Sequence, residues 1–274
     1  MAGPNPLRRK LAIATWRPSR SGNIYGKLTV DATEALAYLD QVRATTGEKV
    51  TITHLVGRAV AQALSVEPSL NGRIRFGKFI PHDHVAITFL VAMEDGSDLA
   101  KAKVDDIDHK GLADIARELR QQAEQLRTGS DTDWEKSKKV IKLLPTSLLR
   151  PLLWVTGWIA SSLGVSAPAL GVTRFPFGSA IVTSVGMFGL DEGYVPFTPF
   201  ARVPLYVLIG AVRDAVTVVD GEVTVRPQLT ITATIDHRFI EGFQGGVLAQ
   251  AVRKVFEDPW AIDRAASPSP AVTA

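Results

Sequence analysis

The chain has 274 residues, of which 46% are hydrophobic and 22% charged, and its formal net charge is +3. This composition supports a sizeable buried core in one or two domains and excludes a disordered chain. The absence of cysteine excludes disulfides, thiolate metal sites and a cysteine nucleophile. Basic and acidic residues interleave, and no basic stripe carries aromatic residues, so nucleic acid is not an expected partner.

Hydrophobic periodicity predicts both helices and strands in the first half of the chain. Helical spacing of apolar residues predicts helices over residues 32–45, 53–66 and 111–127. Strands are predicted over residues 26–31, 74–80 and 84–93. The third of these strands is nearly all apolar, which is typical of an interior position in a sheet.

The C-terminal third is rich in predicted strands. These cover residues 179–185, 205–212, 215–219 and 224–235, and the sequence Asp220-Gly221 predicts a hairpin turn between the last two. A final helix is predicted over residues 244–256, and a flexible tail over 263–274. Helices and strands mix without a regular βαβ rhythm, which favours an α+β sandwich.

Residues 128–174 differ in character from the rest and are interpreted as an inserted helical segment. A basic amphipathic stretch begins at Trp134, and an apolar run of 15 residues covers 151–165. A membrane-spanning helix needs about 20 residues, so this run should not cross a bilayer. Two interpretations remain open: a helical hairpin packed on the body or on another subunit, or a surface helix within 139–165 anchored in a membrane interface by Trp154 and Trp158.

The N-terminal residues 1–10 lack the apolar stretch of a signal peptide. Together with the absence of cysteine, this predicts a cytoplasmic protein. Membrane association through residues 139–165 is the open alternative.

His237 is the candidate general base. It follows a predicted strand, where a side chain can project from a loop into a site. An imidazole can deprotonate a thiol or hydroxyl that attacks a thioester carbonyl, and the oxyanion formed then needs a hydrogen-bond donor. From spacing alone, however, a structural histidine is the more common interpretation.

Five segments, in order along the chain, resemble the catalytic domain of the dihydrolipoyl acyltransferases of 2-oxoacid dehydrogenase complexes. Residues 236–242 read Asp-His-Arg-Phe-Ile-Glu-Gly, similar to that family's His-Arg-x-x-Asp-Gly preceded by Asp. The other four segments are residues 7–12, 59–71, 112–126 and 183–189. The agreement of order and spacing makes the resemblance more specific than one motif could. It implies a catalytic domain over residues 7–262.

The resemblance implies roles for six residues. His237 would be the general base, and Thr183 stands where the family has the serine that stabilises the oxyanion, with Ser184 as the neighbouring alternative. The alternative is that both hydroxyls have no catalytic role and are polar groups at the end of a strand. Glu241 stands where the family has aspartate and would support the loop by pairing with Arg8, and Asp236 would orient the site or cap the turn.

The resemblance also implies a chloramphenicol acetyltransferase-like two-layer sandwich with a mixed sheet, assembled as a homotrimer with active sites between subunits. Assembly of such trimers into a larger cage is left as an open alternative. Coenzyme A would carry the acyl group, and a thiol or hydroxyl acceptor similar to dihydrolipoamide would receive it. A lipoyl-bearing protein is an expected partner, because no lipoylation site is recognised on this chain. The pair His82 and His84 lacks an evident third ligand, so no metal is expected.

Two alternatives to the stand-alone acyltransferase stay open. The departures at Glu241 and Thr183 are compatible with a catalytically weak trimeric scaffold of the same fold. The apolar insertion is compatible with a membrane-peripheral acyltransferase acting on a lipid-like acceptor. Residues 97–104 also lack the family's apolar Ile-Val-Pro-Val run near the substrate channel, so the acceptor is not assigned.

Overall fold

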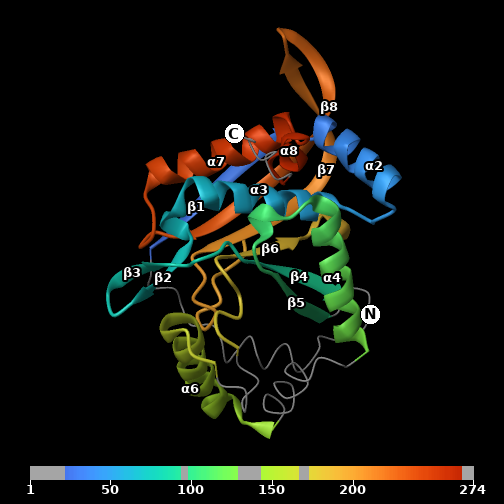
Figure 1. The fold of residues 1–274 in the computed structure, drawn as a ribbon. Helices are drawn as coiled ribbons and strands as arrows, with labels where there is room; N and C mark the ends of the chain where they lie inside the picture. The colour runs from blue at the N-terminus through green and yellow to red at the C-terminus, as the bar shows by residue number, and fades with distance from the viewer. Residues whose placement is uncertain (1–21, 94–97, 129–142, 167–172, 267–274) are drawn as a thin grey trace, which may run out of the picture.

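The computed structural model describes residues 22–93, 98–128, 143–166 and 173–266, and its main feature is a six-stranded mixed sheet (Figure 1). The strand order is β1-β8-β7-β6-β4-β5. The two inner pairs β7–β6 and β6–β4 are parallel, and the other neighbours are antiparallel. The strands are β1 (Asn23–Asp31), β4 (Ile87–Met93), β5 (Asp98–Val104), β6 (Ala180–Ser184), β7 (Leu205–Val219) and β8 (Glu222–Asp236).

Four helices cover one face of this sheet and form the second layer of the sandwich (Figure 1). They are α2 (Thr33–Thr46), α3 (Ile52–Val66), α4 (Leu112–Arg127) and α7 (Gly242–Glu257), and a short α8 (Ala261–Ala266) follows. Because successive strand residues point to opposite faces, Ala180 and Val182 of β6 enter the core under the helices. Ile181 instead packs on the far face with Val203 and Tyr206.

The predicted elements on both sides of the insertion are confirmed, with three corrections. Residues 74–80, predicted as one strand, form the hairpin of β2 (Gly72–Arg75) and β3 (Lys78–Pro81). Its turn places Phe76 and Gly77 at φ 49° and 75°, and the glycine makes this two-residue turn accessible. The two strands predicted over 205–219 are one strand, β7, whose pairing with β8 shifts between Ile209 and Val212.

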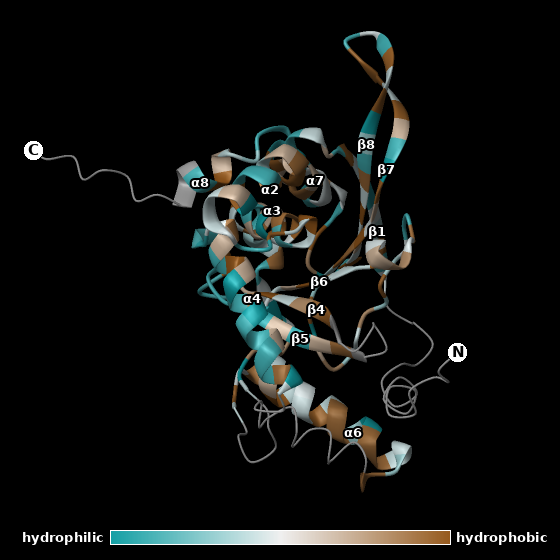
Figure 2. Cartoon of the chain, turned by 90° about the vertical axis from the view of Figure 1, so that its right-hand side faces the viewer, coloured by the Kyte–Doolittle hydropathy of each residue, from teal (hydrophilic) through white to brown (hydrophobic). Residues whose placement is uncertain are grey.

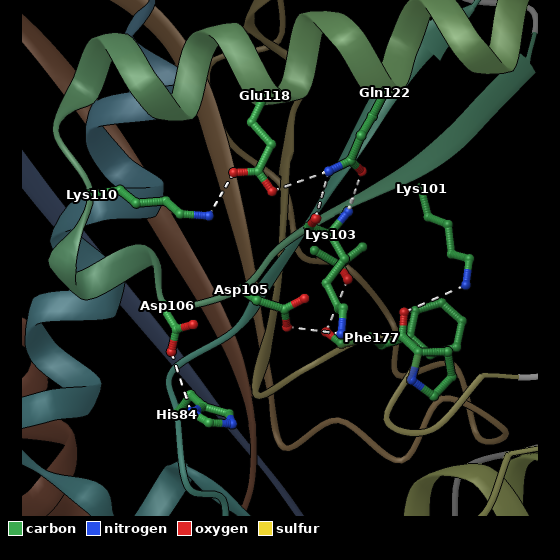
Figure 3. A network of polar contacts seen from close by, with 11 residues as sticks. His84, Lys101, Lys103, Asp105, Asp106, Lys110, Glu118, Gln122 and Phe177 are labelled. Atoms are coloured by element: carbon green, nitrogen blue, oxygen red, sulfur yellow. Dashed lines mark hydrogen bonds and ion pairs between the residues drawn. The ribbon is translucent and has the colours of Figure 1, made fainter.

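Strand β5 is the third correction, because no strand was predicted there. Its buried residues alternate as Ala100, Ala102 and Val104, and two of the three are alanines, so its apolar signal is weak. Because β5 is an edge strand, no further strand pairs with the backbone groups on its outer side. The side-chain amide of Gln122 on α4 pairs with both groups of Lys103: it accepts from the backbone N–H at 3.1 Å and donates to the carbonyl at 2.8 Å (Figure 3). The helix thereby covers the sheet edge at Lys103.

The insertion forms α6 (Thr146–Gly157), followed by a short π-helix, η4 (Trp158–Leu163). It packs on the body through the buried residues Leu149, Ala160 and Ser161, so the predicted contact with the body is present. The outer face of α6 stays apolar (Figure 2). Most of the predicted basic stretch lies outside the described residues. Among the helices that the structure describes, none combines the length and apolarity needed to cross a membrane.

The predicted tail over 263–274 begins inside a helix, because α8 extends to Ala266. Ile262 is buried there, and the Tyr38 hydroxyl of α2 donates to the Asp263 carboxylate at 2.9 Å. The chain is therefore still part of the folded body at residue 263. Residues 267–274 lie outside the described residues.

Candidate active site

His237 lies in the turn that joins β8 to α7, at one end of the sheet. Its backbone N–H donates to the carbonyl of Gly22 at 3.4 Å, which continues the pairing of β8 with β1 by one residue. Its ring Nδ1 lies 2.8 Å from the carbonyl oxygen of Ile240. A carbonyl only accepts, so Nδ1 carries the proton and Nε2 holds the free lone pair. The imidazole is exposed in the single chain and is held in the tautomer that a general base requires.

Asp236 stabilises this turn by binding Arg238. Its carboxylate accepts from the Arg238 backbone N–H at 3.0 Å and from the guanidinium Nε at 2.9 Å. The hydrogen bond to Asp236 raises the pKa of Arg238 against the opposing effect of burial. Of the two roles considered for Asp236, these hydrogen bonds correspond to capping the turn. Asp236 and Arg238 are the two neighbours of His237, so their contacts hold the backbone on both sides of it.

Glu241 is the N-cap residue of α7. It forms a capping box with Gln244, whose side-chain oxygen accepts from the Glu241 backbone N–H at 3.0 Å. A carboxylate suits this position because the first N–H groups of a helix lack backbone partners. The pairing predicted with Arg8 cannot be compared, since Arg8 lies outside the described residues. Glu241 thus has a structural role at the helix start.

Thr183 and Ser184 end β6 and point to opposite faces of the sheet. Thr183 is buried on the face away from the helices, in register with Leu208 of β7 and Thr232 of β8. Ser184 is partly buried, and its Oγ accepts from the backbone N–H of Gly186 at 3.4 Å. The two hydroxyls therefore cannot both donate to the oxyanion of one substrate. Which of them could donate depends on the face of the sheet from which the substrate approaches.

A cavity of about 380 Å³ adjoins Ser184. It is lined by Ile52, Ser184, Met187, Arg213 and the backbone of Gly186 and Gly210, among others. Gly210 is required here, because a Cβ at this position would stand 1.9 Å from the carbonyl oxygen of Asp191. Ser184, Gly186 and Met187 lie in the segment 183–189 noted from the sequence, whereas Ile52, Gly210 and Arg213 come from two other segments and share no motif with it. The cavity has the size of a small-molecule site.

Within one chain, His237 and Thr183 are far apart. The register aligns Thr183 with Thr232 of β8, and His237 follows five residues after Thr232, just past the end of that strand. At roughly 3.4 Å per residue this separates them by about 17 Å along the sheet. Side chains cannot close that gap, so the structure does not bring the two predicted catalytic residues together in a single subunit.

His82 and His84, the two histidines considered as metal ligands, contact different groups. His82 follows β3 and packs its ring against Phe175, with centroids 4.7 Å apart, and burial lowers its pKa to about 4. His84 instead faces the carboxylate of Asp106 at 3.3 Å. The described part of the chain holds no group of three metal-binding side chains.

Solved acyltransferase cores share this arrangement of sheet and helices. A probable dihydrolipoamide acetyltransferase from Listeria monocytogenes 4b F2365 aligns with a TM-score of 0.68 at 21% identity, covering all of this chain and 97% of that one. The cubic core of the pyruvate dehydrogenase multienzyme complex aligns with a TM-score of 0.63 at 20% identity, covering 93% and 87%. The predicted fold class, the two-layer α+β sandwich of these acyltransferase cores, is confirmed.

Sequence relatives lead to the family. The dihydrolipoyllysine-residue acetyltransferase component of the acetoin cleaving system of Bacillus subtilis (strain 168) is 25% identical over 79% of this chain and 44% of its own length. The succinyltransferase component of the 2-oxoglutarate dehydrogenase complex of Escherichia coli (strain K12) is 22% identical over 74% and 39%. This chain thus spans less than half of these relatives. The 2-oxoacid dehydrogenases acyltransferase (catalytic domain) family matches residues 14–139 and 169–263, and the chain belongs to this family.

Residues 140–168 fall outside the family match. They include α6 and η4, and they lie within the insertion predicted over 128–174. Residues 140–168 are therefore a part of this chain that the family pattern does not account for, whereas residues 128–139 and 169–174 of the predicted insertion lie inside the match.

Proposed function

We propose that the protein transfers an acyl group between coenzyme A and a thiol or hydroxyl acceptor similar to dihydrolipoamide. The observation that carries this proposal is the hydrogen bond between His237 Nδ1 and the Ile240 carbonyl, because it leaves Nε2 free to take a proton. Family membership supplies the reaction class. The acyl thioester comes from coenzyme A, and no covalent lipoyl group or metal ion on this chain is part of the proposal.

In the proposed mechanism, Nε2 of His237 removes the proton from the attacking thiol or hydroxyl as that group adds to the thioester carbonyl. The carbonyl oxygen becomes an oxyanion, which the hydroxyl of Thr183 stabilises by donating a hydrogen bond, with Ser184 as the alternative donor. Collapse of the tetrahedral intermediate expels the thiolate, and the imidazolium returns the proton to it. Asp236 and Glu241 act as positioning residues that hold the turn around His237.

This mechanism requires a second copy of the chain, because His237 and Thr183 of one chain lie about 17 Å apart along the sheet. We therefore propose a homotrimer with its active sites between subunits. The tip of the β7–β8 hairpin supports an assembly, since it exposes four valines. Val216 pairs with Val225 and Val218 with Val223, and each is at least 63% exposed. An apolar strip of this kind is typical of a surface that another protein covers.

The activity test incubates the purified protein with acetyl-coenzyme A and dihydrolipoamide and compares it with His237→Ala. A positioned base contributes about 10²–10⁴-fold to the rate, so the variant should lose activity on that scale. Gln121→Ala at an exposed position of α4 is a control outside the proposed site and hairpin surface, and it should leave the rate per site unchanged. Equal rates in wild type and His237→Ala would remove the enzymatic proposal and leave the trimeric scaffold as the function.

A membrane-peripheral acyltransferase is the second candidate, favoured by the exposed apolar face of α6. Leu148, Trp154 and Val155 are 56%, 56% and 44% exposed there. Flotation with anionic vesicles should carry the wild type upward and leave a Leu148→Asp, Trp154→Asp variant at the bottom. If neither protein floats, membrane contact through 139–165 is wrong, and the acyl acceptor is not a membrane lipid.

A lipoyl-bearing protein is the proposed macromolecular partner, since a protein-bound dihydrolipoamide carries the acceptor thiol of the proposed reaction. We also propose that the protein is located in the cytoplasm. The assembly of trimers into a larger cage can be measured in the same preparation by light scattering.

A further inference from the structure

A cluster of three arginines lies between the insertion and the sheet, apart from the candidate active site. The guanidinium Cζ of Arg73 on β2 lies 4.4 Å from the ring centroid of Phe175, and that of Arg174 lies 4.8 Å from the same centroid. The third guanidinium, Arg202 before β7, lies 5.5 Å from the ring centroid of Trp154 on α6. Segments far apart in sequence thus bring three positive charges into one region.

No carboxylate among the described residues forms an ion pair with any of these three arginines. Burial lowers the pKa of Arg73, and the charges of Arg174 and Arg75 lower it further, while Asp83 makes the smallest contribution, in the opposite direction. Burial followed by the charge of Arg238 lowers the pKa of Arg202. Partly buried cations without a counter-charge are unfavourable, so this region favours the arrival of an anion.

The region also contains hydrogen-bond donors without partners. A cavity of about 10 Å³, room for one atom the size of a water oxygen, is lined by Arg73, His82, Ser161, Phe175 and Arg202, among others. Three of these side chains have a buried atom without a hydrogen-bond partner: Arg73 Nε, Ser161 Oγ and Arg202 Nε. Ser161 is itself only 7% exposed. Arginine N–H groups can only donate, and buried unpaired polar atoms are rare in proteins.

His82 adds no charge to the cavity. Its Nδ1 lies 3.5 Å from Nη1 of Arg73 and must accept there, since arginine cannot. With a pKa of about 4 its ring is neutral at pH 7, because burial and the nearby Arg73 oppose protonation. The donors and the positive charge of the cavity therefore come from the arginines and Ser161.

We propose that this cavity binds one small anion, either chloride or a single anionic oxygen of a carboxylate or phosphate group, through Arg73, Ser161 and Arg202. Three residues that line one atom-sized space, each with an unpartnered buried donor and none paired with a carboxylate, match this ligand class. Neither the acyl-transfer mechanism nor the family match accounts for the site, because Ser161 belongs to the insertion.

The bound anion would connect the insertion to the turn that holds His237. Arg202 donates from Nη1 to the Ser162 hydroxyl at 3.2 Å, and two residues further Pro204 accepts from the backbone N–H of Asp236 at 2.9 Å. Arg202 thus contacts η4 on one side and precedes the segment bonded to the catalytic turn on the other. Occupancy of the cavity should stiffen this junction.

The test titrates the intact protein with sodium chloride, sodium acetate and sodium phosphate in separate arms, at constant ionic strength set with sodium HEPES. Thermal unfolding and tryptophan fluorescence are recorded, since Trp154 faces Arg202. Variants Ser161→Ala, Arg73→Gln and Arg202→Gln are compared with Arg127→Gln, which removes the same charge from an exposed position on α4.

The wild type and Arg127→Gln should show a saturable rise in melting temperature with at least one of the three anions. The apparent dissociation constant should increase at least tenfold in Arg73→Gln or Arg202→Gln and measurably in Ser161→Ala. A response to chloride alone identifies a halide site, and a response to acetate or phosphate identifies an anionic oxygen. If the two arginine variants fail to fold, Ser161→Ala decides. No saturable response, or equal responses in Ser161→Ala and wild type, overturns the proposal and leaves a water-filled cavity.

Discussion

His237 Nδ1 and the carbonyl oxygen of Ile240 lie 2.8 Å apart within the turn that connects β8 to α7. The bond joins residues three positions apart, so the histidine tautomer is set by the local turn and not by a distant carboxylate. The remaining nitrogen points its lone pair away from that bond. If Nε2 acts as the general base, the group that donates to the oxyanion has to come from another part of the assembly.

Co-expression of His237→Ala with Thr183→Ala chains should restore activity that neither variant has alone. In a trimer with sites between subunits, a mixed assembly contains interfaces that combine an intact His237 with an intact Thr183. With equal amounts of the two chains, about a quarter of the interfaces should be of this kind. The specific activity of the mixture relative to wild type measures this fraction. Mixing two His237→Ala preparations is the control and should restore nothing.

The two hydroxyls of β6 should differ in their effect on catalysis. Thr183→Ala should lower kcat by about 10²–10³-fold if Thr183 donates to the oxyanion. Ser184→Ala should then change kcat by less than tenfold, because the Ser184 side chain faces the cavity on the opposite side of the sheet. Steady-state kinetics of both variants decide between them, and the reverse order would assign the oxyanion to Ser184.

Gln122→Ala should destabilise the fold, since it leaves the backbone N–H and carbonyl of Lys103 without their partners (Figure 3). Each unpaired buried backbone group costs on the order of 1–3 kcal/mol, so urea unfolding should show a loss of about 2 kcal/mol after allowance for partial solvation. Gln121→Ala on the exposed side of the same helix is the matched control, with a predicted change within about 0.5 kcal/mol.

Stability should fall as the pH drops from about 6.5 to about 4, in part because of His54. Burial and then the charge of Arg43 lower the pKa of His54 from 6.5 to about 4. The unfolded chain therefore binds a proton in this window that the folded chain does not, so stability is complete above pH 6.5 and is lost below it. The contribution is on the order of 3 kcal/mol over the whole window and about 2 kcal/mol between pH 7 and pH 5.

The matched variant for this effect is His54→Gln. His54 Nδ1 accepts from the backbone N–H of Thr51 at 3.0 Å at the start of α3, and glutamine at this position of a capping box can accept the same bond. The difference in unfolding free energy between pH 7 and pH 5 should be smaller in this variant. An unchanged pH dependence would assign the acid sensitivity to other groups, such as His82.

Val218→Lys should weaken self-association, because it introduces a charge into the exposed apolar strip of the β7–β8 hairpin. Light scattering should report a shift of at least part of the protein from trimer to monomer at micromolar concentration. Activity should fall in parallel if the sites lie between subunits. Val66→Lys places the same charge on an exposed valine at the end of α3 and should leave the mass unchanged.

The sequence by itself determined the local elements and the family. Apolar periodicity located α3, α4 and β8, because spacing along a helix or strand follows from residues close in the chain. The segment around His237 was recognised for the same reason, since residues 236–242 contain both the motif and the Ile240 carbonyl that binds the histidine ring. The predictions missed β5, where two of the three buried residues are alanines, and the turn at Phe76 and Gly77.

Only the tertiary structure decided which distant residues meet. The register of β6, β7 and β8 separates His237 from Thr183 within one chain, and no pattern in the sequence contains that register. Arg73, Ser161 and Arg202 likewise come together from three segments, although none of them stands out in its own. Their contacts depend on packing between the layers of the fold, where burial and charge act across space and not along the chain.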